Sequence, residues 1–494
     1  MKQIVLFLNF VFSVSVIFGQ AGPGPRNDSQ NTAYKKRVLE HTEIDVLSSF
    51  YMQNGENAAV TGGIGNEKLT DFATNINVSI PLNADDVLTI DGTVSAYSSA
   101  SSSNLNPFSG ASQSGERSRG EHDDDDDERN RGSGSNVGSP WVASSGASRS
   151  DVWSNGSLGY QHTSDDRNTV YGANLSVSRE FDYGSIGAGL AISHQFNEKN
   201  TELGMKANVY LDRWYPQYPT EIKTYIETRG NLNADYFNGV EIFNQNGIAI
   251  DKYGTAAWQP LKNNLVSTDQ RNTYSVSITF SQILSQSTQI SLFSDLIMQK
   301  GWLSNPMQRV YFSDRDNFYI GSASSIPNYE NSTNSNVFQL ADDIERLPEN
   351  RIKIPIGVRF HQYLNEFLTI KSYYRYYQDN WGIKAHTAQI ELPIKLGNQF
   401  TIYPNYRYYT QTAAIYFAPY EEHLSTEQFY TSDYDLSAFE ANQFGVGLKY
   451  TDIFTKAHLG KLALKNLSLD YGMYLRSTGL TAHIVSVGAK FVLD

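Results

Sequence analysis

The chain has 494 residues, enough for one large closed barrel or for two or three ordinary domains. It contains no cysteine, which excludes disulfides, thiolate metal sites, cysteine nucleophiles and the attachment of haem or lipid through cysteine. The formal net charge of -13 gives no support to nucleic-acid binding. Charged residues make up only 18% of the chain, beside 32 Tyr and 25 Phe, which is typical of strands with one face in lipid and one in water.

The N-terminus has the pattern of a secretory signal peptide. Lys2 precedes the short apolar run 4–18, and small residues follow it. We therefore expect 1–20 to be a cleaved signal peptide and 21–40 to be a periplasmic N-terminal tail. No later segment is long and apolar enough for a membrane helix, so any spanning structure must be a closed barrel, which satisfies its backbone hydrogen bonds internally.

From residue 41 onward, apolar and polar side chains alternate with a period of two, which indicates half-buried β-strands. In the run 201–212, one face carries Leu203, Met205, Ala207, Val209 and Leu211. Comparable runs occupy 41–52, 71–82, 86–99, 149–163, 169–180, 183–196, 201–212, 270–281, 287–299, 350–363, 366–378, 381–393, 399–410, 439–452, 462–476 and 479–493. We predict an all-β fold, a transmembrane antiparallel β-barrel of about 16 strands, with a range of 14 to 18.

The connections between these runs sort by length. Alternate links, beginning with 83–85, are short, whereas the four very long links all fall on the other side, at 100–148, 213–269, 300–349 and 411–438. Barrels of bacterial outer membranes have short periplasmic turns and long extracellular loops. We therefore expect residues 41–494 to form an outer-membrane barrel of a Gram-negative bacterium, in contact with outer-membrane lipid.

Two loop motifs have a chemical interpretation and a simpler structural one. The acidic run Asp123–Asp127 offers carboxylates, but its spacing does not match a calcium loop, and we expect a solvated, self-repelling loop. The glycine-rich segment 60–65, VTGGIG, has strands on both sides rather than a helix after it. We expect a tight extracellular turn that needs positive φ angles, and not a phosphate cradle.

Several stretches carry a family resemblance over almost the whole mature chain: residues 41–71 around GGIG, YSSASS at 97–102, SRSDVW at 148–153, GWLSNPMQRVYF at 301–312 and YYRYYQDNWGIKAHT at 373–387. They resemble a family of uncharacterised bacterial outer-membrane β-barrel proteins, a domain of unknown function. The resemblance implies a barrel. It also implies an association with thioredoxin-like proteins and a flavin transferase, and thus with envelope redox or lipoprotein partners. The sequence itself shows no cofactor motif, and we expect no cofactor and no metal.

The same alternation predicts a basic wall inside the barrel. On the runs 350–363, 366–378 and 399–410 it directs seven cationic side chains inward, together with Tyr373, Tyr403 and Tyr409. These candidate selectivity residues are Arg351, Lys353, Arg359, His361, Lys371, Arg375 and Arg407. Basic walls favour anions in pores. Alternatively, these cations pair with inward acids on other strands, for which the candidates are Glu202, Asp212, Asp295 and Asp470. Five aromatic residues near strand ends, Tyr374, Tyr376, Trp381, Tyr406 and Tyr408, are expected in the interfacial girdles.

Three functions remain open on the sequence. The first is a pore or channel subunit for small solutes. The second is a plugged structural or partner-binding barrel, its lumen closed by the loops 213–269 and 300–349. The third and weakest is an outer-membrane hydrolase, because no GxSxG or HExxH motif occurs and the histidines are scattered. We expect no enzymatic activity. Sequence cannot separate the first two, since neither function needs a motif.

Overall fold

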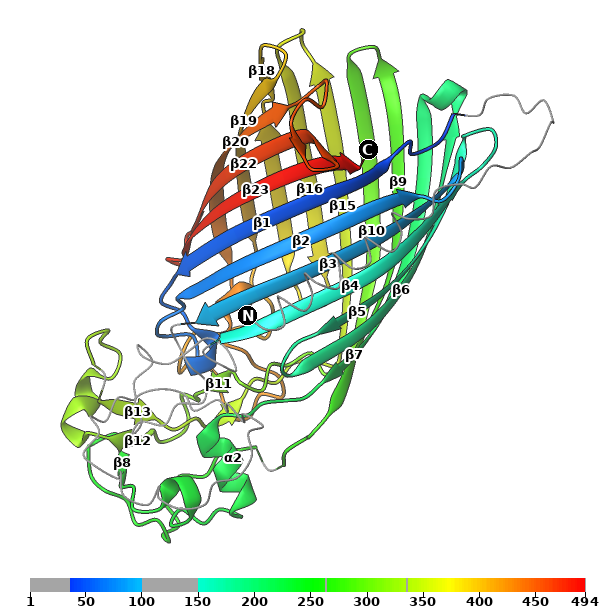
Figure 1. The fold of residues 1–494 in the computed structure, drawn as a ribbon. Helices are drawn as coiled ribbons and strands as arrows, with labels where there is room; N and C mark the ends of the chain where they lie inside the picture. The colour runs from blue at the N-terminus through cyan, green and yellow to red at the C-terminus, as the bar shows by residue number, and fades with distance from the viewer. Residues whose placement is uncertain (1–35, 100–149, 263, 335, 494) are drawn as a thin grey trace.

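The computed structural model describes residues 36–99, 150–262, 264–334 and 336–493. Its main body is a closed antiparallel β-barrel (Figure 1). The first strand, β1 (Thr42–Asn54), pairs with the last, β23 (Thr481–Leu493), through thirteen residues of β1, which closes the sheet. The predicted fold class and strand number are confirmed, since 16 long strands form the barrel. Among the described residues, no helix is long and apolar enough to cross a membrane.

The other long strands of the barrel follow in chain order: β2 (Leu69–Pro81), β3 (Asp86–Ser99), β4 (Ser150–Thr163), β5 (Thr169–Arg179), β6 (Tyr183–Phe196), β7 (Thr201–Trp214), β9 (Asp269–Ser285), β10 (Thr288–Gly301), β15 (Asn350–Tyr363), β16 (Thr369–Asp379), β17 (Lys384–Glu391), β19 (Phe400–Gln411), β20 (Phe439–Thr451) and β22 (Leu462–Arg476). Two short segments, β18 (Ile394–Leu396) and β21 (His458–Leu459), extend the sheet at its turn end. Each long strand pairs with its neighbour in sequence, so the barrel has up-and-down topology.

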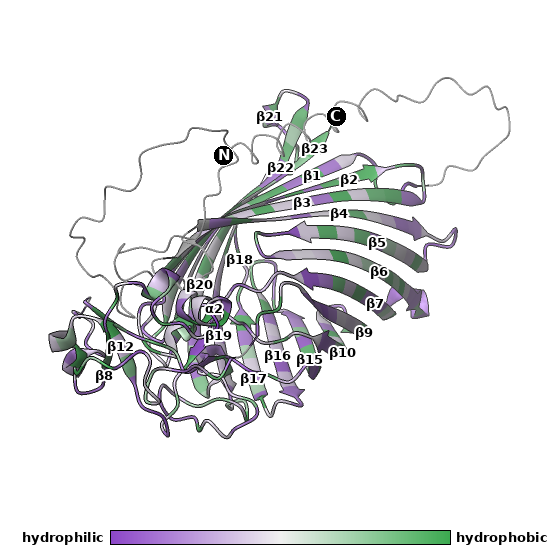
Figure 2. Ribbon diagram, turned by 90° about the horizontal axis from the view of Figure 1, so that it is seen from below, coloured by the Kyte–Doolittle hydropathy of each residue, from purple (hydrophilic) through white to green (hydrophobic). Residues whose placement is uncertain are grey.

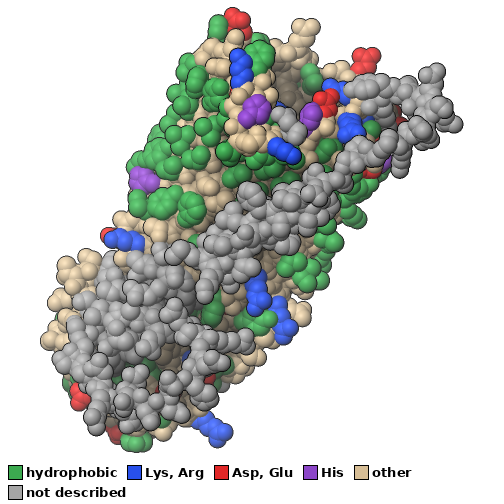
Figure 3. Space-filling model, in the orientation of Figure 1, with side chains coloured by type: hydrophobic (Ala, Val, Ile, Leu, Met, Phe, Trp, Pro, Cys, Tyr) green, Lys and Arg blue, Asp and Glu red, His purple; other side chains and the backbone are tan. Residues whose placement is uncertain are grey.

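Apolar side chains cover the outside of this barrel. On β5 every second residue is exposed, including Tyr171, Leu175 and Val177, and β6 exposes Ile186 and Leu190 in the same way. Figure 2 shows the resulting alternation of hydropathy along the strands, and Figure 3 shows hydrophobic side chains gathered over the barrel wall. In water such exposure would be unfavourable, whereas in a bilayer it provides the lipid-facing belt.

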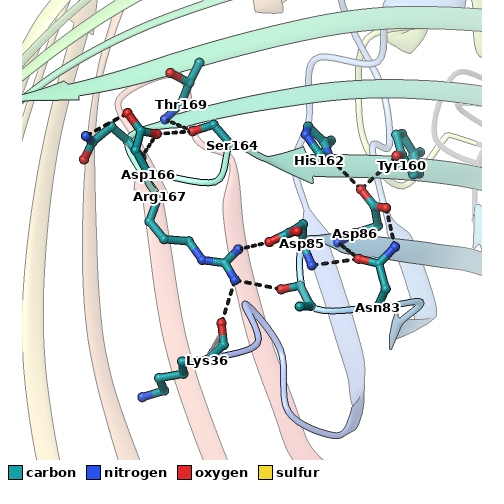
Figure 4. Close-up of polar contacts among 12 residues, drawn as sticks. Lys36, Asn83, Asp85, Asp86, Tyr160, His162, Ser164, Asp166, Arg167 and Thr169 are labelled. Atoms are coloured by element: carbon teal, nitrogen blue, oxygen red, sulfur yellow. Dashed lines mark hydrogen bonds and ion pairs between the residues drawn. The ribbon is translucent and has the colours of Figure 1, made fainter. Parts of the chain in front are cut away.

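Short connections join neighbouring strands at one end of the barrel. We call this end the turn end and expect it to be periplasmic. Arg167, in the β4–β5 turn, ties three segments together there (Figure 4). Its guanidinium donates to the carbonyl oxygens of Lys36 at 2.6 Å and Ala84 at 3.0 Å, and it lies 2.7 Å from a carboxylate oxygen of Asp85. The first described residues of the chain are therefore held against the turn end.

The long connections gather at the opposite end, beyond the strands (Figure 1). We call three of them, 215–268, 302–349 and 412–438, the loop cap. Its short elements are α2 (Thr220–Glu227), β8 (Ile242–Asn244), β11 (Arg309–Val310), β12 (Phe318–Gly321), β13 (Val337–Gln339), β14 (Asp343–Ile344) and the 3-10 turns η3 (Asp235–Phe237), η4 (Ala323–Asn328) and η5 (Tyr434–Leu436). Strands β8, β12 and β13 form a small sheet of their own, and β11 pairs with β14. Two further 3-10 turns, η1 (Ala59–Thr61) and η2 (Asn197–Lys199), lie in other connections.

The loop cap has its own hydrophobic core. Ile222, Phe237 and Trp258 from its first segment pack against Ile320 and Phe338 from its second, all essentially without solvent exposure. The indole nitrogen of Trp258 donates to the carbonyl oxygen of Ala341 at 3.1 Å. The cap is therefore a folded unit rather than a set of independent surface loops.

A fully buried ion pair joins α2 to β11 within this core. Arg309 donates from Nε to Oε1 of Glu221 at 2.6 Å and from Nη2 to Oε2 at 3.1 Å. Neither side chain is exposed. Arg309 also donates to the carbonyl oxygen of Val60, at 2.9 Å, in the β1–β2 connection. Because a buried charge needs partners on all sides, this arginine fixes three segments relative to one another.

The glycine-rich segment confirms the expected turn. Gly62, Gly63 and Gly65 all have positive φ angles, at 81°, 93° and 98°, and η1 precedes them. A Cβ on Gly62 would lie 2.6 Å from the Tyr311 ring. Both the backbone conformation and the approach of the loop cap therefore require glycine here.

Two expectations from the sequence, both in the region of β17, need correction. The run 381–393 is not one strand, because β17 ends at Glu391 and Pro393, which has no N–H to donate, separates it from β18. Trp381 does not belong to an interfacial girdle. It is only 2% exposed, packs with Leu347 and donates to the Asn350 carbonyl oxygen. The expected signal peptide, most of the N-terminal tail and the acidic run Asp123–Asp127 lie outside the described residues.

Candidate functional site in the barrel lumen

The predicted basic wall lies on four adjacent strands. β15 pairs with β16, β16 with β17, and β17 with β19, so cationic residues distant in sequence share one surface. Outward positions of β15 are occupied by exposed apolar residues, Ile352, Ile356 and Phe360, which directs the intervening side chains into the lumen. The structure places all seven candidate residues on this lumen-facing side of the four strands.

The middle of the wall is an aromatic platform beneath an arginine. The rings of Phe293, from β10, and Tyr373, from β16, stack with centroids 5.7 Å apart and an interplanar angle of 12°. The Arg359 guanidinium lies 4.6 Å from the Phe293 centroid and 5.8 Å from that of Tyr373. Gly357 makes room, because a Cβ there would lie 2.3 Å from the Phe293 ring. The platform holds the cationic group by cation–π attraction without neutralising it.

The loop end of the wall is partly neutralised. Arg351 donates through two nitrogens to the Asp379 carboxylate, at 2.9 and 2.6 Å, and lies 4.3 Å from the Trp381 ring. Lys353 is opposite Asp379 in the strand register, but the ion pair of this carboxylate is with Arg351. Arg351 is therefore attached to the rim, where the wall meets the loop cap, and Asp379 offsets only one of the two cations.

The turn end of the wall is also partly neutralised. Lys371 forms an ion pair with Glu391 at 2.8 Å. His361 lies opposite Lys371 in the register, so it is beside a cation rather than a carboxylate. Apart from Lys353, the net positive charge of the wall comes from residues between its two ends.

Three arginines supply that charge. Within the described chain, Arg359, Arg375 and Arg407 have no carboxylate within ion-pair distance. Arg359 and Arg407 are exposed to solvent even though their strand positions face inward. The Nε atom of Arg375 is buried without a hydrogen-bond partner among the described residues. An exposed, inward-directed guanidinium requires open space in front of it, which indicates a hollow lumen at this height.

Of the acids expected to neutralise the wall, Asp470 contacts Tyr403 on β19, whereas Asp212 and Glu202 lie on another strand, β7. Asp212 accepts from Ser185 at 2.7 Å and lies 3.8 Å from Arg271, while Glu202 accepts from Gln195 at 2.9 Å. The acids that do pair with the wall, Asp379 and Glu391, were missed by sequence analysis. Glu391 could have been found, since it shares the inward parity of β17, whereas Asp379 is the last residue of β16, one position beyond the predicted run 366–378.

Two of the other histidines, His386 and His483, face away from the lumen. His386 and His483 are near the outward-facing Tyr374 and Tyr471, with Nδ1 to hydroxyl distances of 2.7 and 2.9 Å. Among the described residues there is also no group of three or more His, Asp or Glu side chains that could hold a metal ion.

The fold defines a class: a closed 16-stranded antiparallel β-barrel of the outer-membrane kind. The chain belongs to the DUF3570 family, a family of proteins of unknown function, whose model matches residues 25–464. The resemblance inferred from the sequence is thereby confirmed. No curated protein matches the chain.

Solved structures similar to the barrel come from outer-membrane proteins. A bacterial polysaccharide outer membrane secretin is 9% identical, with a TM-score of 0.39 and coverage of 92% of this chain and 99% of that one. Pseudomonas aeruginosa OccK1 (OpdK) is 9% identical, with a TM-score of 0.34 and coverage of 92% and 98%. The Pseudomonas putida toluene transporter TodX is 7% identical, with a TM-score of 0.37 and coverage of 92% and 90%. Likenesses this distant carry no argument about function.

Proposed function

We propose that the protein is a pore of the Gram-negative outer membrane that favours small anionic solutes. The observation that carries the proposal is the solvent exposure of two inward-directed arginines, Arg359 and Arg407. Barrels of 16 strands are wide enough for an aqueous channel, unlike barrels of about 8 strands, which side chains fill. Uncompensated guanidinium groups along such a channel attract anions and repel cations.

The position of the loop cap supports the same proposal. The second function, a barrel plugged by its own loops, requires the long connections to fold into the lumen. Instead they pack on one another, around Ile222, Trp258 and Phe338, and lie beyond the strand ends (Figure 1). At the rim, Leu347 of the cap packs with Trp381, which lies in the connection between β16 and β17 of the basic wall. The cap would then restrict access from above the wall rather than fill the lumen.

The test is planar-bilayer conductance of the purified protein under a salt gradient. We expect discrete steps and a reversal potential that favours anions. Replacing Arg359, Arg375 and Arg407 by Gln should move the anion-to-cation permeability ratio towards unity, because no carboxylate masks these charges. The matched control replaces Lys199, Lys456 and Lys461, three exposed lysines in turns away from the wall, by Gln. Conductance with unchanged selectivity in the arginine variant would show that the wall does not select, and a folded but silent barrel would refute the pore.

A second candidate function follows from the folded loop cap. A rigid extracellular unit with its own core is suited to hold a partner at the mouth, such as an envelope redox or lipoprotein component. This alternative predicts a silent barrel that conducts only when a partner binds. Deleting the cap would separate the two: a pore should then conduct more, whereas a partner-dependent barrel should stay silent.

A further inference from the structure

A row of cationic side chains lies on the outside of the barrel, at the loop end. Arg179 on β5 is opposite Gly184 on β6, Gly184 is opposite Arg213 on β7, and Arg213 is opposite Gln270 on β9. These positions form one line across four strands. Lys300 on β10, opposite Asn272 of β9, extends the line by one more strand.

The strand parity shows that this row faces outward. Arg179 continues the exposed series of β5 that includes Leu175 and Val177, and Arg213 follows the exposed Leu211 on β7. Lys300 has the parity of Leu292 and Leu296 on β10, which are 48% and 53% exposed. Each cation thus stands directly above the apolar belt, at the height where a bilayer changes from hydrocarbon to headgroups.

Among the described residues, no carboxylate lies within ion-pair distance of Arg179, Arg213 or Lys300, and the row has open space between its cations. Gly184 lacks a side chain, and a Cβ added there would meet no atom within 4 Å. Arg179 and Arg213 flank it with backbones about 10 Å apart, from two strand spacings. Outward positions at the loop end of these five strands, all of them described, include no carboxylate, since Asp212 and Asp269 have the opposite parity. A hollow of about 790 Å³ lies beside Arg213, Gln270, Asn272 and Lys300. Asp212 and Asp269 also line this hollow, and Asp212 lies 3.8 Å from the Arg271 guanidinium.

We propose that this outer basic row, made of Arg179, Arg213 and Lys300 with Gln270 and Asn272, binds the phosphate groups of an anionic glycolipid in the outer leaflet. Guanidinium and ammonium groups are the usual partners of phosphate, and the two amides add neutral donors. The apolar belt below the row, with Leu211 and Leu296, would contact the acyl chains of the same lipid. This lipid site does not depend on whether the lumen conducts.

The test compares lipid retention by native mass spectrometry. Purified protein is incubated with lipid A, either carrying its phosphates or after their enzymatic removal. We expect the wild type to retain the phosphorylated form preferentially. Replacing Arg179, Arg213 and Lys300 by Gln should lower that retention by more than about tenfold, since each juxtamembrane cation contributes about fivefold. Replacing Lys199, Lys456 and Lys461 by Gln removes the same charge at the turn end and should leave retention unchanged.

Three results would overturn the proposal. The row variant could retain lipid as well as the control variant does, or the wild type could retain both forms of lipid A equally. Alternatively, millimolar inorganic phosphate could displace the lipid completely, which would indicate a site for free phosphate. Folding is checked by heat-dependent migration in electrophoresis. If the triple variant does not fold, Arg213→Gln alone should lower retention by about fivefold, and no change would count against the row.

Discussion

The barrel and the loop cap bury opposite kinds of side chain. On the barrel, Leu190 and Ile186 are 68% and 63% exposed, while the arginines of the wall point inward. In the cap, Trp258 and Ile222 are fully buried around a core that water surrounds. The strands thus place apolar side chains outward, as a lipid environment favours, whereas the loops bury them, as water favours. The two regions should therefore respond differently to the same substitution.

The largest difference is expected at the buried ion pair of the cap. Glu221→Gln leaves the Arg309 guanidinium buried without its counter-charge, which costs about 3–5 kcal/mol. Because the barrel strands do not depend on this pair, the cap should unfold while the barrel stays folded. Protease treatment of intact cells should cut within 215–268 and 302–349, and the barrel should keep its heat-dependent electrophoretic migration.

The control for this prediction lies on the same helix. Glu227 forms only an exposed pair with Lys223, at 4.0 Å, and such pairs contribute about 0–1 kcal/mol. Glu227→Gln should therefore leave the protease pattern unchanged. If Glu221→Gln also leaves it unchanged, the cap is not held by its core, and its rim contacts with the barrel must suffice.

A second prediction uses two equally exposed aliphatic side chains. Leu190 lies midway along β6 at 68% exposure, and Ile415 lies in the cap at 70%. Leu190→Lys should destabilise the barrel in bilayers by about 2–4 kcal/mol, since it places a charge in hydrocarbon. Ile415→Lys should stay within about 0.5 kcal/mol, because water already surrounds that side chain. Urea unfolding from lipid vesicles measures both, and equal effects would contradict the assigned membrane belt.

The same contrast explains what sequence could predict. A lipid-facing strand must alternate along its whole length, so β15 was predicted with its exact bounds, and the lumen positions of Arg359 and Arg375 followed from parity. The cap has no period. Its core joins Ile222 to Phe338, more than a hundred positions apart, through short irregular elements. The partners Asp379 and Glu391 were missed because side-chain pairing depends on register, which one sequence does not reveal.

The last prediction concerns pH and is confined to the cap. Burial, together with the nearby Asp433 carboxylate, raises the pKa of Glu345 from 4.5 to about 8. Its carboxyl oxygens accept from the Thr431 hydroxyl and the Asn305 N–H, both at 2.6 Å. Between pH 4.5 and 8 the folded cap holds a proton that the unfolded cap releases, so cap stability should fall as pH rises through this range. Amide hydrogen exchange of cap peptides, corrected for its intrinsic pH dependence, should show faster opening at the alkaline end.

Glu345→Gln tests whether this carboxyl causes the pH response, because the amide keeps a hydrogen-bond acceptor and cannot ionise. It should flatten the pH dependence of cap opening, leaving a smaller slope of the same sign from Asp342, whose pKa burial raises to about 7. The exposed Glu349, changed to Gln, should retain the wild-type slope. The barrel strands should show no parallel change, since this carboxyl lies in the cap. A slope that is unaltered in Glu345→Gln would assign the pH response to other carboxyls of the cap.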